Sequence, residues 1–222
     1  MSNDLIDLQD RCSPPYAVKA SADFIHRYDN GERNFRGVQL DRAPLADVCL
    51  ENSNLSSANL RHTAWPGGRL VNVDFTNAEL VGAIFTNARF EQAKFFDTAL
   101  MGTNLQGTEF KRCHIQRVNF AGANLSDSSL AETYIHIAVF FGSTLVRTDL
   151  SNLVLKDVGF EKASIFDCDL RGTTFIKASL KGACIKDTDL SSTLFFEVSY
   201  DEFTSWPTGF DPKTKSGLLL GE

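Results

Sequence analysis

The sequence has no long apolar run, no excess of basic residues and no secretory-type start, and each absence excludes a class of protein. A membrane-spanning helix needs about eighteen or more consecutive apolar residues, and no such run occurs. Lys and Arg number 22 against 28 Asp and Glu, so the net charge of −6 argues against direct nucleic-acid binding through a basic field. Residues 1–7 are acidic and lack the apolar centre of a secretory signal.

Motifs for covalent, metal or phosphate chemistry are also missing. The five cysteines show no CxxC spacing, so we expect free thiols, which suit a reducing cytoplasm, and no zinc site. The glycines are singly spaced and form no phosphate-binding loop, and no serine stands in a nucleophile elbow. We therefore expect no catalytic residue, no metal and no cofactor, and we predict that the chain is not an enzyme.

The sequence is instead rich in phenylalanine, with 18 Phe against 2 Trp and 4 Tyr. Every fifth residue from Phe35 to Tyr200 is large and apolar, and these 34 positions hold 17 Leu, 11 Phe, 4 Ile, 1 Trp and 1 Tyr. From Val38 to Val198 the residue two places earlier is small (Ala, Thr, Val, Ser, Cys or Gly) in every unit except that of Leu153. This unbroken register predicts one repeat architecture from residue 33 to residue 202.

A period of five fits neither an α-helix nor a long strand. Residues two apart in an extended segment point to the same side, so the small and the large residue of each unit can both face inward. A turn must then restore the phase, and Gly recurs two residues after the large residue, as at Gly82 and Gly122. The pattern predicts a chain that coils around its own apolar axis.

Units such as Ala58-Asn59-Leu60 and Ala123-Asn124-Leu125-Ser126-Asp127 resemble those of the pentapeptide-repeat proteins, in particular bacterial and cyanobacterial members. The resemblance implies an all-β fold, a right-handed quadrilateral parallel β-helix with four units per coil. The 34 units would then make about 8.5 coils, and a rod of about 40 Å at the spacing of paired strands. We expect an N-terminal segment with a capping helix at 1–32, the β-helix at 33–202 and a capping tail at 203–222.

Both open ends of such a rod need caps. Ser13 can cap a helix that begins with Pro14, and Gly31 can end it, which predicts a helix near 15–29 after a mobile segment 1–12. Its apolar face would contain four residues: Ala17, Ala20, Phe24 and Tyr28. At the other end we expect three aromatic residues to cover the last coil: Phe203, Trp206 and Phe210.

With four units per coil, residues twenty apart lie one above another. Phe120, Phe140 and Phe160 should form an aromatic stack inside the rod. A ligand channel is the alternative interpretation of such a ladder, and we favour a filled core because these rings suit a narrow, densely packed axis. His114 and His136 would lie on neighbouring coils, but no third metal ligand is placed beside them.

Two surface features follow from the same spacing. Asp149, Asp169 and Asp189 should form a carboxylate ladder, either because their side chains bond turn amides or because they meet a basic partner or a cation. Val81, Met101, Ala121 and Phe141 should form an outward apolar strip, flanked by Ala99 and Val139, that is either a partner interface or ordinary scattered apolar surface. We expect a second cluster, Ile176, Leu194 and Phe196, to be covered by the C-terminal tail.

These features favour a non-enzymatic scaffold that binds an unidentified protein partner, with a homodimer through the apolar strip as one form of it. The family resemblance offers an alternative, a DNA mimic that binds DNA gyrase and inhibits topoisomerase activity or protects against quinolones. The mild, divided acidity weakens that alternative. A purely structural or stress-related protein without a dedicated partner is the third interpretation.

Overall fold

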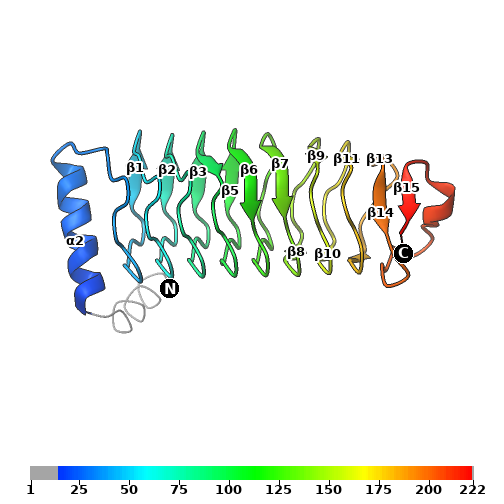
Figure 1. Cartoon of the computed structure of the whole chain (residues 1–222), viewed down its shortest axis with the longest axis horizontal. Coiled ribbons are helices and arrows are strands. Elements are labelled where there is room, and N and C mark those ends of the chain that lie inside the picture. Colours follow the sequence, from blue (N-terminus) through cyan, green and yellow to red (C-terminus); the bar gives the residue numbers. More distant parts are fainter. Residues whose placement is uncertain (1–14, 222) are drawn as a thin grey trace.

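A computed structural model describes residues 15–221, which form a rod of stacked coils (Figure 1). Helix α2 (Pro15–Asp29) lies across one end and strand β15 (Leu218–Leu220) lies at the other (Figure 1). Paired residues are twenty positions apart along the rod, as Leu50 and Leu70 are, so one coil contains four five-residue units; the last bridge, Cys184 to Ser205, spans 21. The predicted parallel β-helix with a short N-terminal helix is confirmed.

Short parallel strands form three sheets along the sides of the rod. One contains β1 (Cys49–Glu51), β2 (Arg69–Val71), β3 (Arg89–Glu91) and β5 (Glu109–Lys111). A second contains β4 (Lys94–Phe96), β6 (His114–Asn119), β7 (Tyr134–Val139), β9 (Val154–Lys156), β11 (Thr174–Ile176) and β13 (Leu194–Phe196). The third contains β8 (Thr144–Val146), β10 (Ser164–Phe166) and β12 (Cys184–Lys186), and at the C-terminal end β14 (Val198–Tyr200) pairs with β15.

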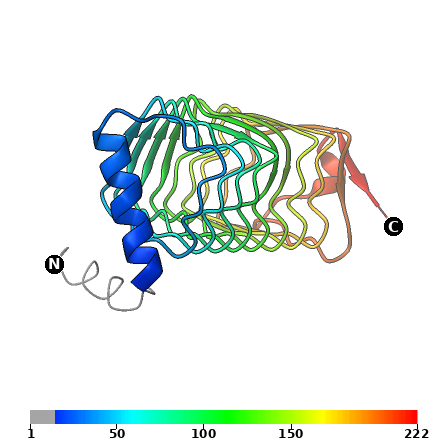
Figure 2. The same ribbon diagram turned by 60° about the vertical axis from the view of Figure 1, so that its left-hand side comes forward.

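The corners of the coils use the left-handed backbone region. The residue two places after the large one has a positive φ at nearly every unit, as in Asn52 (φ 52°) and Gly82 (φ 68°). Gly, Asn and Asp adopt this conformation more readily than other residues, which explains why they recur in that slot. A turn at each corner lets every unit return its small and large residues to the inside (Figure 2).

The interior is filled by the periodic side chains. All 34 large residues from Phe35 to Tyr200 are buried. The rings of Phe120 and Phe140 are stacked 4.7 Å apart, and those of Phe140 and Phe160 are 4.8 Å apart. Inward Ser, Thr and Cys donate to backbone carbonyls, as Thr148 Oγ1 does to Leu125 O at 2.9 Å. Among the described residues no buried side-chain polar atom lacks a hydrogen-bond partner.

The N-terminal helix covers the first coil. Phe24 is buried with its ring 4.6 Å from that of Phe35, and Tyr28 Oη accepts a hydrogen bond from the Glu51 amide at 2.9 Å. The chain leaves the helix at Gly31, whose φ of 93° suits a glycine. The predicted cap at Ser13 and Pro14 and the segment 1–12 lie outside the described residues.

The C-terminal tail covers the end of the rod and leaves the side of the rod uncovered. Trp206 packs 5.5 Å from Tyr200 and 5.0 Å from Phe210, whereas Phe203 is 73% exposed. After the 3-10 turn Pro212–Thr214, β15 pairs with β14 and extends the coil stack. The expectation that this tail covers the second apolar cluster was wrong: Leu194 and Phe196 stay about half exposed, and Ile176 is half-buried.

Candidate functional site

The apolar strip predicted from the sequence is a single column of stacked residues. The amides of Gly82, Gly102 and Gly122 donate to the carbonyls of the next coil at three of its members: Met101, Ala121 and Phe141. Val81, Met101 and Ala121 are half-buried, while Phe141 is 46% exposed. The strip therefore offers one prominent side chain, at the end of the column.

Exposed apolar surface continues from Phe141 to its neighbours along the chain, and not to Ala121 and Met101 in the column. Five large apolar side chains lie exposed on this coil and at the start of the next, and we call them the apolar band: Tyr134, Ile137, Val139, Phe141 and Val154. Tyr134 and Val154 belong to β7 and β9 on one side of the rod, and Val139 and Phe141 lie beyond the corner at Ile137. The band therefore wraps around one long edge of the rod.

Ile137 occupies a corner position that suits it poorly. Its φ is 53°, and among the described residues with positive φ it is the only apolar one. A β-branched side chain in the left-handed region is strained, and such strain is a feature of functional sites. The exception at Ile137 is visible in the sequence. In every other unit the position two residues after the large apolar residue holds glycine or a polar or charged residue.

A shallow groove follows the second half of the band. It measures about 320 Å³ and is lined by Ile137, Val139 and Gly159, among others. Gly159 pairs with Val139 across the coils and does not have a positive φ, so the backbone does not require glycine there. A side chain at Gly159 would meet the Glu161 carboxylate, which lies over this glycine, and the Lys162 ammonium lies 5.4 Å from the Phe141 ring.

The three aspartates of the predicted ladder bond the amides of their own turns. The Oδ1 atoms of Asp149, Asp169 and Asp189 accept from the backbone N–H two residues on, at 2.8 to 3.1 Å. Arg171 also pairs with Asp169, and its guanidinium holds the pKa of that carboxyl below the usual range. These local bonds give each aspartate a structural role, and binding of a partner by the ladder stays a prediction.

Other acidic residues pair with arginines of the neighbouring coil. Arg117 makes two hydrogen bonds to Asp97, at 2.6 and 2.7 Å, and Arg147 Nε lies 2.7 Å from Asp127 Oδ1. Further pairs of this kind join Arg69 to Glu51, Arg89 to Glu109 and Arg112 to Glu132. The negative charge of the rod is thus interrupted by positive charge along its length.

Within residues 15–221 no three His, Cys, Asp or Glu side chains are grouped so that they could hold a metal ion. His136 Nε2 lies 3.3 Å from Asp157 Oδ2, and the His114 ring lies 6.1 Å from that of Tyr134. Cys113 and Cys168 are buried in the small inward slot. None of the described helices is long and apolar enough to cross a membrane.

The fold and the repeating unit define this chain as a parallel β-solenoid of five-residue units. The family model described as pentapeptide repeats matches it in eight copies, over residues 53–92, 93–130 and 160–192, which is half of the chain. The protein belongs to the pentapeptide-repeat family. The matched segments leave out residues 131–159, which carry the apolar band.

Solved structures share this fold. HetL, a pentapeptide-repeat protein involved in heterocyst differentiation regulation from the cyanobacterium Nostoc sp. strain PCC 7120, is 19% identical, with a TM-score of 0.56 over 84% of this chain and 90% of its own. Full-length QnrB1, a plasmid-mediated fluoroquinolone resistance protein, is 15% identical, with a TM-score of 0.47 over 81% of this chain and 94% of its own. No curated protein sequence matches the chain.

Proposed function

We propose that this protein is a non-enzymatic scaffold that binds a protein partner on the apolar band. The observation that carries the proposal is the position of the band, which lies where the sequence departs from the repeat pattern at Ile137 and Leu153. All five side chains are exposed there, and Ile137 stands at a left-handed corner that the other coils fill with glycine, polar or charged residues.

The shape of the band limits the partner. Because the five side chains wrap around one edge of the rod, a partner that buries all of them must have a concave surface. Exposed aromatic residues such as Tyr134 and Phe141 are the side-chain type that contributes most to protein–protein binding. A homodimer through the apolar band is one form of the proposal.

The DNA-mimic alternative receives no support from the surface. Mimicry of a nucleic acid needs a concentrated negative potential, and Asp97, Asp127 and Glu51 are each paired with an arginine. HetL, whose fold is shared, acts in the regulation of differentiation, and a regulatory binding role for this chain is consistent with that likeness. We therefore propose protein binding and do not propose gyrase binding.

Affinity capture from a lysate of the source organism tests the proposal. The double variant Val139→Asp/Phe141→Asp places two carboxylates in the band, and Phe203→Asp, an exposed phenylalanine of the C-terminal tail, is the matched control. We expect the wild type and the control to recover a protein that the double variant does not. Sedimentation of the purified proteins separates a homodimer, which only the double variant would dissociate, from a different partner.

Recovery of the same proteins by all three, together with identical sedimentation, would refute the proposed surface. Loss of folding in the double variant would be visible as a lowered melting temperature. In that case Val154→Asp, whose side chain is 58% exposed, replaces it.

A further inference from the structure

The hydrogen-bond ladder along the six-stranded sheet lacks one bond. The N–H of Tyr134 donates to Cys113 O at 3.0 Å and that of Thr174 to Leu153 O at 2.8 Å, but no such bond joins Val154 N–H to Thr133 O between them. Tyr134 and Val154 are likewise not paired with each other, although their neighbours Ile135 and Leu155 are. Neither Val154 N–H nor Thr133 O has another hydrogen-bond partner among the described residues.

Leu153 explains the missing bond. It is the one large residue in the small inward slot, and it is buried. The slot is filled by Thr133 one coil earlier and by Thr173 one coil later. The extra volume has to be accommodated, and overpacking in a dense core shifts the backbone. The two coils therefore separate locally at this position.

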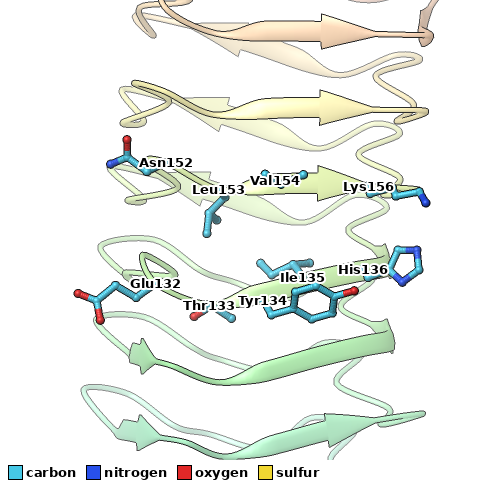
Figure 3. Close-up of a pocket in the computed structure, with 9 residues that line it drawn as sticks. All are labelled: Glu132, Thr133, Tyr134, Ile135, His136, Asn152, Leu153, Val154 and Lys156. Atoms are coloured by element: carbon cyan, nitrogen blue, oxygen red, sulfur yellow. The ribbon is translucent and has the colours of Figure 1, made fainter.

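A cavity lies where the coils separate. It measures about 400 Å³ and is bordered by Leu153, Val154 and Tyr134 (Figure 3). Figure 3 shows Leu153 pointing into the space between the two coils, with the Tyr134 ring on the coil below. Lys156 and His136 lie together at one end of the cavity, and Glu132 and Asn152 lie at the other (Figure 3).

The polar groups around this cavity are not equivalent. Glu132 is paired with Arg112 at 3.6 Å, so its charge is compensated. Lys156 is exposed and has no ion pair with any described residue. By the geometry of the ladder, the unpaired Val154 N–H points toward the preceding coil and thus into the gap. The gap therefore holds one unpaired backbone donor and one unpaired backbone acceptor, and the cavity beside it combines apolar walls with a positive charge at one end.

We propose that this cavity binds a small apolar or aromatic group that carries a carboxylate. The ring or aliphatic part would contact Tyr134, Leu153 and Val154, and the carboxylate would lie at the end of the cavity where Lys156 and His136 stand. Such a group can be a free aromatic acid or an acidic residue beside an aromatic residue in a peptide. The inference does not depend on the proposed partner, because it is tested on the purified protein alone.

NMR titration of protein labelled with 15N-valine tests this site. The probes are 3-phenylpropionate, its neutral analogue 3-phenylpropanamide, and the capped peptide acetyl-Phe-Asp-Gly-amide. We expect saturable shifts of the Val154 amide with at least one of the two carboxylate probes. We expect no saturable shift with the neutral 3-phenylpropanamide. A response to 3-phenylpropionate alone assigns the site to free acids, and a response to the peptide alone assigns it to a peptide segment. No saturable shift, or equal shifts with the amide analogue, overturns the proposal.

Two variants identify the groups responsible. Leu153→Val restores a small residue to the slot, so the ladder should close, hydrogen exchange at Val154 should slow by about tenfold or more, and probe binding should be lost. Lys156→Gln should weaken the carboxylate probe by about threefold to fivefold without changing hydrogen exchange. If Leu153→Val leaves both exchange and binding unchanged, Leu153 does not open the cavity and the proposal fails.

Discussion

Phe140 and Phe141 are adjacent in the chain and lie on opposite sides of the coil wall. The Phe140 ring is 0% exposed and stacked between Phe120 and Phe160, whereas the Phe141 ring is 46% exposed beside Lys162. Alternate directions of successive side chains in an extended segment produce this separation. One phenylalanine thus stabilises the rod, and its neighbour is available for binding.

The two phenylalanines should respond differently to substitution. Phe140→Ala should lower the free energy of unfolding by about 3–5 kcal/mol, because it removes a buried ring and leaves a cavity in the stack. Phe141→Ala should change it by less than about 0.5 kcal/mol, because the side chain is largely on the surface. Denaturant unfolding monitored by circular dichroism measures both. A loss of similar size for Phe141→Ala would contradict its placement outside the core.

The strain at Ile137 gives a prediction of the opposite sign. Ile137→Asn should raise the free energy of unfolding by about 1 kcal/mol, because asparagine tolerates the φ of 53° better than a β-branched residue. The same variant should recover less of the proposed partner, since it removes apolar surface from the band. Thermal unfolding and affinity capture on the same samples test the two effects together.

Gln92→Asn is the control for Ile137→Asn. Gln92 is exposed, has a φ of 56° and lies at a corner of another coil. It is not β-branched, so its replacement should stabilise the rod less. If Ile137→Asn stabilised no more than the control, the left-handed position would carry no special strain.

Acid should destabilise the rod through its paired carboxylates. Hydrogen bonds from Arg117, Arg147 and Arg171 hold the pKa values of Asp97, Asp127 and Asp169 below their usual range. A carboxyl whose pKa is lower in the folded state stabilises it above the unfolded pKa of about 3.9, and this contribution is lost as the pH falls through the folded pKa.

The melting temperature should therefore be nearly constant from about pH 7 to about pH 5 and should fall below about pH 4. Added salt should reduce the effect, because all three pairs lie at the surface. The triple variant Asp97→Asn/Asp127→Asn/Asp169→Asn provides the comparison. An unchanged loss of stability in acid for that variant would assign the loss to other groups.

The periodic core could be predicted from the sequence because burial of a side chain depends on its size and spacing. Phe120 and Phe160 could be placed in one stack by counting alone, and the helix could be placed over the first coil from Phe24 and Tyr28. The path of the tail could not be predicted, since residues 203–222 follow no repeat. The tail packs on the end of the rod, and Leu194 and Phe196 on its side therefore stay exposed.

The candidate site could be predicted only in part. Phe141 and Val139 could be placed on the surface from their outward positions. Ile137 and Leu153 are exceptions to the repeat, and the repeat alone does not say what such exceptions do. The position of an irregular residue can be read from a periodic sequence. Its effect on the structure cannot, because that effect depends on how far the neighbouring coil moves. The missing bond between Val154 and Thr133 is such an effect, and only coordinates reveal it.

The cysteines offer a measure of how tightly the coils stay closed. Burial raises the pKa of the Cys113 thiol to about 12 and that of Cys168 to about 11, so neither forms a thiolate at neutral pH. Cys49 is exposed. Iodoacetamide should therefore modify Cys49 in the folded protein and should modify Cys113 and Cys168 only after unfolding, as peptide mass spectrometry would show.

The comparison of Cys168 with Cys113 also tests local opening near the apolar band. Cys113 Sγ donates to Phe90 O at 3.5 Å, and Cys168 Sγ donates to Leu145 O at 3.2 Å, so each thiol is held against the coil before it. If the strain at Ile137 and the missing bond at Val154 loosen only the two coils that contain them, both thiols should stay equally protected from iodoacetamide. Faster modification of Cys168 in the folded protein would instead show that the opening spreads toward the C-terminal coils, and Leu153→Val should then suppress it.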